Sequence, residues 1–475
     1  MKKLFSIILL AGIVTGTGCK KFLAEQPQSQ LLYGNFDAQS IESATVGIYE
    51  PLTRSRGRLW ESHYTAALTL LEDYAHSRYT PQEAYANYDF TQITYQDNFW
   101  PTFYQAISRA NILINVLQGG TFANGNKYIG EARFVRAICY YQLVRCWGKV
   151  PLRLQPVADA QNTGQPLAEV AEVYNQIISD LQFAEANLPN TTTQYGRATA
   201  GAAKVTLADV YLTLARYADA RTKAKEVMDN KSVYGYDLLA SFSDIFSPTS
   251  ATSSEEVFAL KFSRSNGLGS FVADYAASIN QFQGFAAAGN ETFGALSTTP
   301  FIKNWDDNDP RKAWTLYNKA VVNGTNVVIN VAPPNDLLYG KFRDPLAPSE
   351  TGAGNDFFLY RYADVLLIFA EAENKVNGPS ADAYNAVNMV RRRGYGVGIT
   401  TANAAVDLPA GLTQSTFDDM VFRERGYEFM EEDKRWFDLL RTGRYKTEIP
   451  AAGKRLPPST LFPIPALEKL TNDKL

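Results

Sequence analysis

Amphipathic helices that come in pairs, with alanine at many of their buried positions, restrict the fold of this chain more than any other sequence feature. The stretch 202–228 reads AAKVTLADVYLTLARYADARTKAKEVM, and its apolar residues recur at intervals of three and four. Such spacing is typical of helices that each bury one face. A second pair is predicted over 362–392, where alanines again occupy the apolar positions. The chain is therefore expected to be mainly α-helical.

Three further helices are predicted from the same periodicity. They cover 103–114, 131–146 and 170–188, and they end at Gly119-Gly120, at Gly148 and at Pro189-Asn190. The small residues and the aromatic at the turn resemble tetratricopeptide-type hairpins, but the period of about 34 residues typical of those repeats does not run through the chain. We therefore expect an irregular superhelix of helical pairs.

Two cysteines fall within one predicted helix. Cys139 and Cys146 are seven residues apart, or roughly 10 Å along the helix axis, which is too far for a disulfide. Both are predicted to be buried as apolar residues.

Between about residues 233 and 355 the composition changes. Ser, Gly, Asn, Thr and Pro become frequent, and short β-like runs appear at 257–262 and 327–331. A long irregular region in a compact protein is either disordered or functional, and the many aromatics here favour order. This loop-rich, minor-β region is expected to take part in ligand binding. The tail after Gly443 is predicted to be loop-like, with an extended segment LFPIP at 461–465.

The N-terminus has the pattern of an export signal. Lys2 and Lys3 precede an apolar run over 4–14, and small residues lead to Gly18-Cys19. An eleven-residue helix would rise only ~16 Å, about half of a bilayer core, so this segment does not predict a membrane span. Residues 1–18 are predicted to be a signal peptide, and Cys19 is predicted to be lipidated and to anchor the chain to a membrane. Ordinary secretion with a coincidental cysteine is the alternative.

Composition excludes several functional classes. Lys and Arg total 46 against 49 acidic residues, a net charge of −3 with a pI near 5.7, so a nucleic-acid partner is not expected. Only two histidines and three cysteines are present, which leaves few options for a metal site and none for a disulfide framework. We expect no cofactor and no metal. The chain contains no G-x-S-x-G motif, and we expect no catalytic residues.

Several motifs occur together in a recognisable order. They are EARFVRAICYYQLVRCWGKVPL (131–152), RYADVLLIFAEAEN (361–374) and RERGYEFMEEDKRWFDLLRTGR (423–444), with CKKFL (19–23), GRAT (196–199), DPR (309–311) and LFPIP (461–465). This set resembles the SusD/RagB family through nearly the whole mature chain. One departure is Asp433, which stands where many relatives carry glycine.

The resemblance implies a function as well as a fold. Family members are outer-membrane surface lipoproteins that capture nutrients, usually glycans, for a SusC-like TonB-dependent transporter. It implies one SusD-like domain over 19–475, made of an N-terminal helical part (19–230), a loop-rich insertion (231–355) and a C-terminal helical part with its tail (356–475). We therefore expect a non-catalytic protein at the cell outer membrane, with an oligosaccharide ligand. A peptide ligand, a secreted glycoside hydrolase and a scaffold with only protein partners are the alternatives.

Two stretches carry aromatic rings with polar side chains between them. A sugar ring has flat apolar faces and a rim of hydroxyls, so its binding site needs exposed aromatic rings flanked by hydrogen-bonding groups. Residues 60–100 and 281–285 provide both, and the resemblance implies that loops in these regions line the ligand site. The candidates are Asp73, Arg78, Tyr79, Tyr88, Asn98, Trp100, Phe282 and Phe285. For each of them, core packing is the alternative.

The charged block 423–444 has two interpretations. On a helix, Glu431 and Arg435 would attract each other across one turn, whereas Glu424 and Glu428 would repel each other unless a cation lies between them. A structural helix with salt bridges is the favoured interpretation. The alternative takes Glu431 and Asp438 as the acid pair of a glycosidase.

Overall fold

The computed structural model describes residues 37–53, 59–60, 63–93, 95–157, 164–265, 268–270, 292–322, 325–331, 333–348 and 352–475. The contacts between residues divide the chain into two units, with the boundary after Ser43. The packing described below is that of the unit Ala44–Leu475. Within the described ranges, no helix is both long and apolar enough to cross a lipid bilayer.

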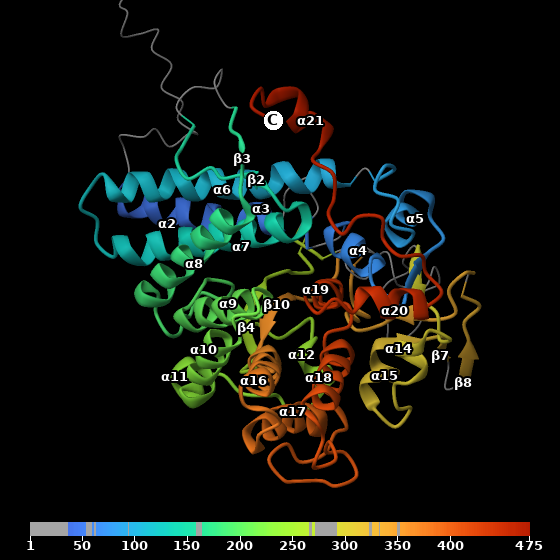
Figure 1. Cartoon of the computed structure of the whole chain (residues 1–475). Helices are drawn as coiled ribbons and strands as arrows, with labels where there is room; N and C mark the ends of the chain where they lie inside the picture. The colour runs from blue at the N-terminus through green and yellow to red at the C-terminus, as the bar shows by residue number, and fades with distance from the viewer. Residues whose placement is uncertain are drawn as a thin grey trace, which may run out of the picture. The chain divides into compact units, whose positions relative to one another are not determined.

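A series of packed helices forms the scaffold of this unit (Figure 1). Each helix packs against the one before it, from α6 to α10, and α16 then packs against α10 and is followed by α17 and α18. Residues 230–361 are thus inserted between two helices that are neighbours in space. The chain is mainly α-helical, as predicted from the sequence. The scaffold helices are α6 (Gln96–Gln118), α7 (Gly125–Trp147), α8 (Val170–Asn187), α9 (Ala200–Thr213), α10 (Tyr217–Asp229), α16 (Tyr362–Asn377), α17 (Ala381–Gly394) and α18 (Gln414–Glu428).

The predicted hairpins are confirmed, and local signals explain their ends. In α9, the Thr199 side chain accepts a hydrogen bond from the backbone N–H of Ala202, which satisfies a donor that the helix leaves free. Ser380 caps α17 in the same way. The alanines at the helix contacts, among them Ala220 and Ala383, are fully buried, so adjacent backbones approach closely. Cys139 and Cys146 are buried free thiols, as expected.

Shorter elements surround this scaffold. The helices are α2 (Ala38–Gly47), α3 (Glu50–Thr53), α4 (His63–Leu70), α5 (Thr80–Ala86), α11 (Lys231–Tyr234), α12 (Phe242–Ile245), α14 (Pro300–Lys303), α15 (Pro310–Thr315), α19 (Arg435–Arg441), α20 (Tyr445–Ala451) and α21 (Ala466–Thr471). The described strands form antiparallel two-stranded ribbons: β1 (Ala75–Ser77) with β5 (Phe293–Ala295), β2 (Val150–Pro151) with β3 (Leu167–Ala168), β4 (Glu256–Leu260) with β10 (Phe357–Arg361), β6 (Leu316–Tyr317) with β9 (Leu338–Tyr339), and β7 (Lys319–Val322) with β8 (Thr325–Val328).

The C-terminal tail is more ordered than predicted. Instead of a continuous loop after Gly443, it contains α20 and α21. These helices are only one to two turns long, so hydrophobic periodicity could not reveal them; in α20 the one buried residue is Ile449. The segment 461–465 is extended, as expected. Its Phe462 backbone N–H donates to the Cys146 carbonyl at 2.7 Å, and the Trp147 indole N–H donates to the Pro463 carbonyl at 3.1 Å.

A buried ionic cluster joins α15, α17, α18 and β10. The Arg311 guanidinium lies between Glu424 and Glu428, with N–O distances of 2.7 and 2.9 Å, so a cation does separate the two like charges. Arg361 and Arg393 also bind Glu428. Burial alone would raise the pKa of Glu428, but the surrounding arginines lower it, so this carboxylate stays ionised.

The expected attraction between Glu431 and Arg435 does not form. The chain leaves the helical conformation between α18 and α19, where Glu431 and Asp433 have positive φ angles of 65° and 58°. This turn points Arg435 elsewhere, and its guanidinium binds Asp73 at 2.8 Å. The block is therefore the end of α18 and the short helix α19 with a sharp turn between them, and its charges are structural.

Candidate functional site

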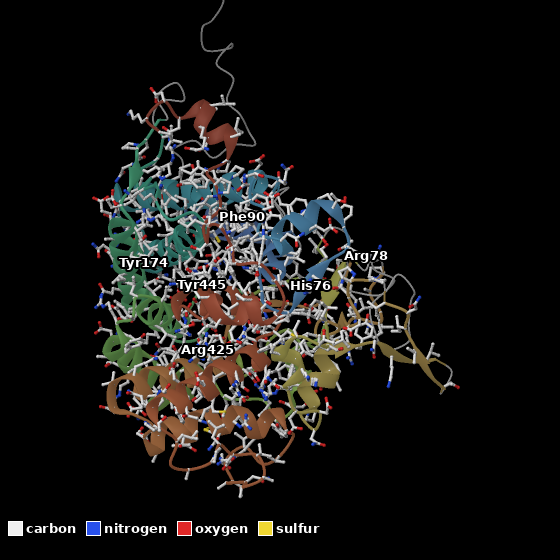
Figure 2. The ribbon with its side chains drawn as sticks, turned by 45° about the vertical axis from the view of Figure 1, so that its right-hand side comes forward. His76, Arg78, Phe90, Tyr174, Arg425 and Tyr445 are labelled. Carbon is white, nitrogen blue, oxygen red and sulfur yellow. The ribbon has the colours of Figure 1, made fainter. Side chains whose placement is uncertain are left out.

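The ribbon of β1 and β5 leads to two of the candidate residues, Arg78 and Tyr79, which follow β1 directly. His76 pairs with Gly294 in this ribbon, and Ser77 pairs with Phe293. The ribbon continues for one further bond, in which the Arg78 backbone N–H donates to the Thr292 carbonyl at 3.0 Å. Arg78 then emerges at the surface (Figure 2). The exposed Tyr79 follows it and precedes α5. The Tyr79 side chain is 47% exposed.

A pocket of about 750 Å³ lies next to this segment. One wall consists of α5 and the turn after it, another is His76, and a third comes from the tail at 453–455. Its polar lining residues are His76, Thr80, Glu83, Asn87, Asp89, Gln92, Lys454 and Arg455. The volume is within the range of roughly 300–1,000 Å³ that small-molecule sites occupy. Amide, carboxylate and guanidinium groups around an open pocket suit a ligand with many hydroxyls.

A backbone turn at Tyr88 directs this side chain into the protein interior and the side chains on either side of it towards the pocket. Tyr88 has a φ of +55°, which is uncommon for a residue with a Cβ. Its ring is buried against Trp436 at a centroid distance of 6.0 Å, and its hydroxyl donates to the Leu71 carbonyl at 2.9 Å. Asn87 and Asp89, on either side of it, line the pocket. Tyr88 therefore positions pocket residues from inside the protein.

Lys454 fixes the tail beneath the ribbon. Its ammonium donates to the backbone carbonyls of Leu70, Glu72 and Ala75 at distances of 2.8–3.1 Å, which ties the tail to the loop that leads into β1. Burial lowers the pKa of Lys454 to about 7, although Asp73 and Glu72 nearby favour its charged form. The next residue, Arg455, donates to the Asn87 carbonyl at 2.5 Å. Two tail residues thus bind the segment that leads into β1 and the turn after α5.

The histidine of the pocket is neutral near pH 7. Burial, and then the positive charge of Lys454, lower the pKa of His76 to about 4. At neutral pH its imidazole is therefore a hydrogen-bonding group without charge. Among the described residues, no three or more His, Cys, Asp and Glu side chains lie together as a metal site would require.

The structure separates the sequence candidates into two groups. Arg78, Tyr79 and Asn98 are exposed. Asp73, Tyr88 and Trp100 are buried, and each has partners inside the protein: Asp73 binds Arg435, and the Trp100 indole N–H donates to Glu468 at 3.1 Å. Burial leaves these three no surface for a ligand, so their place is in the core. Phe282, Phe285 and the lipidation candidate Cys19 lie outside the described residues.

The pocket also contains residues that sequence reasoning missed. Asn87, Asp89 and Gln92 fall within the predicted 60–100 stretch, but its alternation of rings and polar groups did not single them out. Lys454 and Arg455 lie more than 350 residues further along the chain. The basic character of the tail was the only signal that pointed to them.

Glu431 and Asp438 cannot act as the acid pair of a glycosidase. Burial raises the pKa of Glu431 to about 8. Asp438 is also buried; burial would raise its pKa, but ion pairs with Arg425 and Arg441 lower it. Both carboxyl groups belong to the core, so they cannot flank a glycosidic bond.

Comparison with known proteins identifies the family. One family model, described as the SusD family, matches residues 253–455, and another, described as starch-binding and associating with the outer membrane, matches residues 21–212. With this fold, the two matches define the class: the chain belongs to the SusD/RagB family.

Individual relatives match nearly the full length. SusD-like protein P2 of Formosa agariphila is 28% identical and aligns with 93% of this chain and 91% of its own. A SusD-like protein of Bacteroides ovatus is 26% identical, over 94% of this chain and 83% of its own.

Solved structures share the fold. A SusD homolog from Bacteroides thetaiotaomicron has a TM-score of 0.77 at 22% identity, covering 92% of this chain and 96% of that one. Surface glycan-binding protein A from the same species, solved in complex with laminarihexaose, has a TM-score of 0.75 at 20% identity, covering 92% and 98%.

Proposed function

We propose that this chain binds oligosaccharides in the pocket beside α5 and delivers them to a SusC-like TonB-dependent transporter. The supporting observation is the pocket itself. Its lining offers several side chains that can hydrogen-bond hydroxyls, and the exposed ring of Tyr79 comes directly before the lining residue Thr80. An aromatic platform beside hydrogen-bonding groups is what a sugar ring requires. Relatives solved with laminarihexaose and with a xylogluco-oligosaccharide support a glycan as the ligand.

We also propose that the protein acts at the outer membrane without altering its ligand. The N-terminal pattern ending in Cys19 supports a lipid anchor, and the family description refers to the outer membrane. The burial of Glu431 and Asp438, the acid pair considered for a glycosidase, supports a function without hydrolysis.

Titration of the purified protein with laminarihexaose, a xylogluco-oligosaccharide and a panel of other neutral glycans tests the function. We expect one class of glycan to bind. Tyr79→Ala and Asn87→Ala should each weaken this binding by about 3- to 10-fold, which corresponds to the roughly 0.5–1.5 kcal/mol that a single contact contributes. Tyr217→Ala, on α10 and outside the pocket, is the matched control and should bind as the wild type does.

The alternatives predict other outcomes. Release of reducing ends from a bound glycan would indicate a hydrolase. Binding of peptides in place of glycans would support the peptide-binding alternative. For the transporter, we expect co-purification with a TonB-dependent barrel from membranes; its absence would contradict the delivery step.

A further inference from the structure

A second pocket, of about 330 Å³, lies away from the first. It is formed by the loop 190–199 between α8 and α9, by the turn after α11, and by residues 252–259, which lead into β4 and along it. In Figure 1, α11 is at the lower left of the unit, whereas α5, which lines the first pocket, is on the right. No function considered so far uses this second pocket.

Two stacked tyrosines form one wall of the second pocket. The rings of Tyr234 and Tyr236 are 5.7 Å apart between centroids and 24° from parallel. Gly235 between them has a φ of +73°, a left-handed conformation that glycine adopts without strain and that ends α11. This turn allows the rings of Tyr234 and Tyr236 to stack, although only Gly235 separates them in the chain.

The tyrosine pair lies against the start of α9. A Cβ on Gly201 would be 2.6 Å from the Tyr236 hydroxyl oxygen and 3.0 Å from a ring carbon of Tyr234, so only glycine leaves room for the rings there. The Tyr236 hydroxyl also hydrogen-bonds Thr199, the capping residue of α9, at 3.2 Å. The contacts with Gly201 and Thr199 thus hold the two tyrosine rings in place against α9. A third ring, Tyr195, lines the pocket and is 53% exposed.

Hydroxyl groups surround these rings, and the charges nearby are compensated. Thr191, Thr252 and Ser253 line the pocket, and the buried Ser253 hydroxyl has no hydrogen-bond partner among the described residues. The two charged lining residues are already paired: Arg197 binds Glu131, and Glu256 binds Lys261. The pocket therefore offers flat apolar rings and neutral hydrogen-bonding groups, with no free charge to attract an ion.

We propose that this second pocket is an additional saccharide-binding site that takes one or two neutral sugar units. Stacked rings suit the apolar face of a sugar, and the hydroxyl rim suits its edge. A peptide or a phosphorylated ligand would leave its charges unpaired here, which disfavours both. This inference rests on the proposed function as a glycan-binding protein and adds a site that is independent of the first. Two separated sites on one chain would hold a long polysaccharide more firmly than either alone.

Hydrogen–deuterium exchange of the full chain, with and without each glycan of the panel, tests the second site. We expect a bound glycan to slow exchange in 190–199 and 231–237, separately from 76–92 of the first pocket. Tyr195→Ala removes only an exposed ring, so it should fold normally and abolish protection of 190–199 while leaving 76–92 protected. Tyr234→Ala should do the same. Tyr217→Ala is again the control and should retain both effects.

The results separate the two proposals. Protection of 76–92 alone, with every glycan, overturns the second site and leaves the proposed function intact. Protection of 190–199 that survives both Tyr195→Ala and Tyr234→Ala also overturns it. Protection of 190–199 alone supports the second site and contradicts the first. A panel that protects neither segment contradicts both.

Discussion

At the scale of single residues, Asp433 is the clearest conflict between the sequence and its environment. Its φ of +58° is a left-handed conformation that favours glycine. Its carboxyl group is buried, with one oxygen bonded to the Thr65 hydroxyl at 3.1 Å and the other without a partner among the described residues. Burial raises its pKa to about 8. The protein is folded in spite of this residue.

We predict that Asp433→Gly stabilises the protein most at alkaline pH. The folded-state pKa of about 8 exceeds the usual value of 3.8, so between these pH values the folded chain holds a proton that the unfolded chain has released. Stability is therefore lost as the pH rises towards 8, and the variant should escape this loss. At pH 8.5 we expect a gain of about 1–3 kcal/mol in the free energy of unfolding.

Chemical denaturation from pH 5 to pH 9 measures this effect. Asp433→Asn is the control for charge: it tolerates the same backbone conformation and cannot ionise, so its advantage over the wild type should also grow with pH. A difference between variant and wild type that stays constant over this range would show that the carboxyl group is not the cause.

The residue scale is also where sequence analysis was weakest. The composition of the 60–100 stretch directed attention to a segment that includes one wall of the first pocket, but it could not distinguish an exposed Tyr79 from a buried Tyr88. Aromatic and polar residues alternate in the same way around an exposed tyrosine and around a buried one. Burial depends on what the rest of the chain places on top, and here Trp436 covers Tyr88.

At the scale of elements, Arg311 holds α15 against α18. It is fully buried between Glu424 and Glu428 and also binds Asp309 of its own turn. We predict that Arg311→Met lowers the free energy of unfolding by about 3–5 kcal/mol, because it leaves the buried Asp309 carboxylate without a cation among the described residues and takes one cation from Glu424 and from Glu428. Urea denaturation measures the loss.

Two further variants test the cause. Arg216 forms an ion pair with Asp219 at the surface, and Arg216→Met should cost less than about 1 kcal/mol. The double variant Arg311→Met with Asp309→Asn should recover part of the loss, since Asp309 is the carboxylate that Arg311→Met leaves unpaired. Equal costs for the buried and the exposed arginine would contradict this account.

Elements with strong periodicity were predictable, and short ones were not. The long scaffold helices bury a face on every turn, so their spacing and their glycine ends were visible in the sequence. By contrast, α20 buries one residue, Ile449, and β1 has three residues. Elements of this size form because neighbours fix them, and a local pattern cannot report those neighbours.

At the scale of the whole molecule, the scaffold helices pack in chain order, but the chain leaves the scaffold between α10 and α16, which pack directly on each other. The insertion between them is tied back to the scaffold through Arg311, which binds Glu424 and Glu428 of α18. The sequence indicated both the scaffold and the insertion. It could not indicate that the tail reaches back to the loop before β1, because such long-range contacts leave no local signal.

The sequence also predicts that the protein is attached to a membrane through Cys19. We expect Cys19→Ala to move the protein from the membrane fraction to the soluble fraction, because the thiol that would carry the acyl groups is gone. Cys139→Ala is the matched control: this cysteine is buried in α7, and its loss should leave the protein with the membrane. Immunoblots of fractionated cells give the result, and membrane retention of Cys19→Ala would refute the anchor.

The tail that closes the first pocket has a consequence for biosynthesis. Residues 76–92 are made early and residues 453–455 late, yet the pocket needs both. A chain truncated ahead of Gly453 would lack the wall that residues 453–455 provide and would keep only the wall formed by residues 76–92. The pocket is therefore complete only when the last part of the chain has been synthesised.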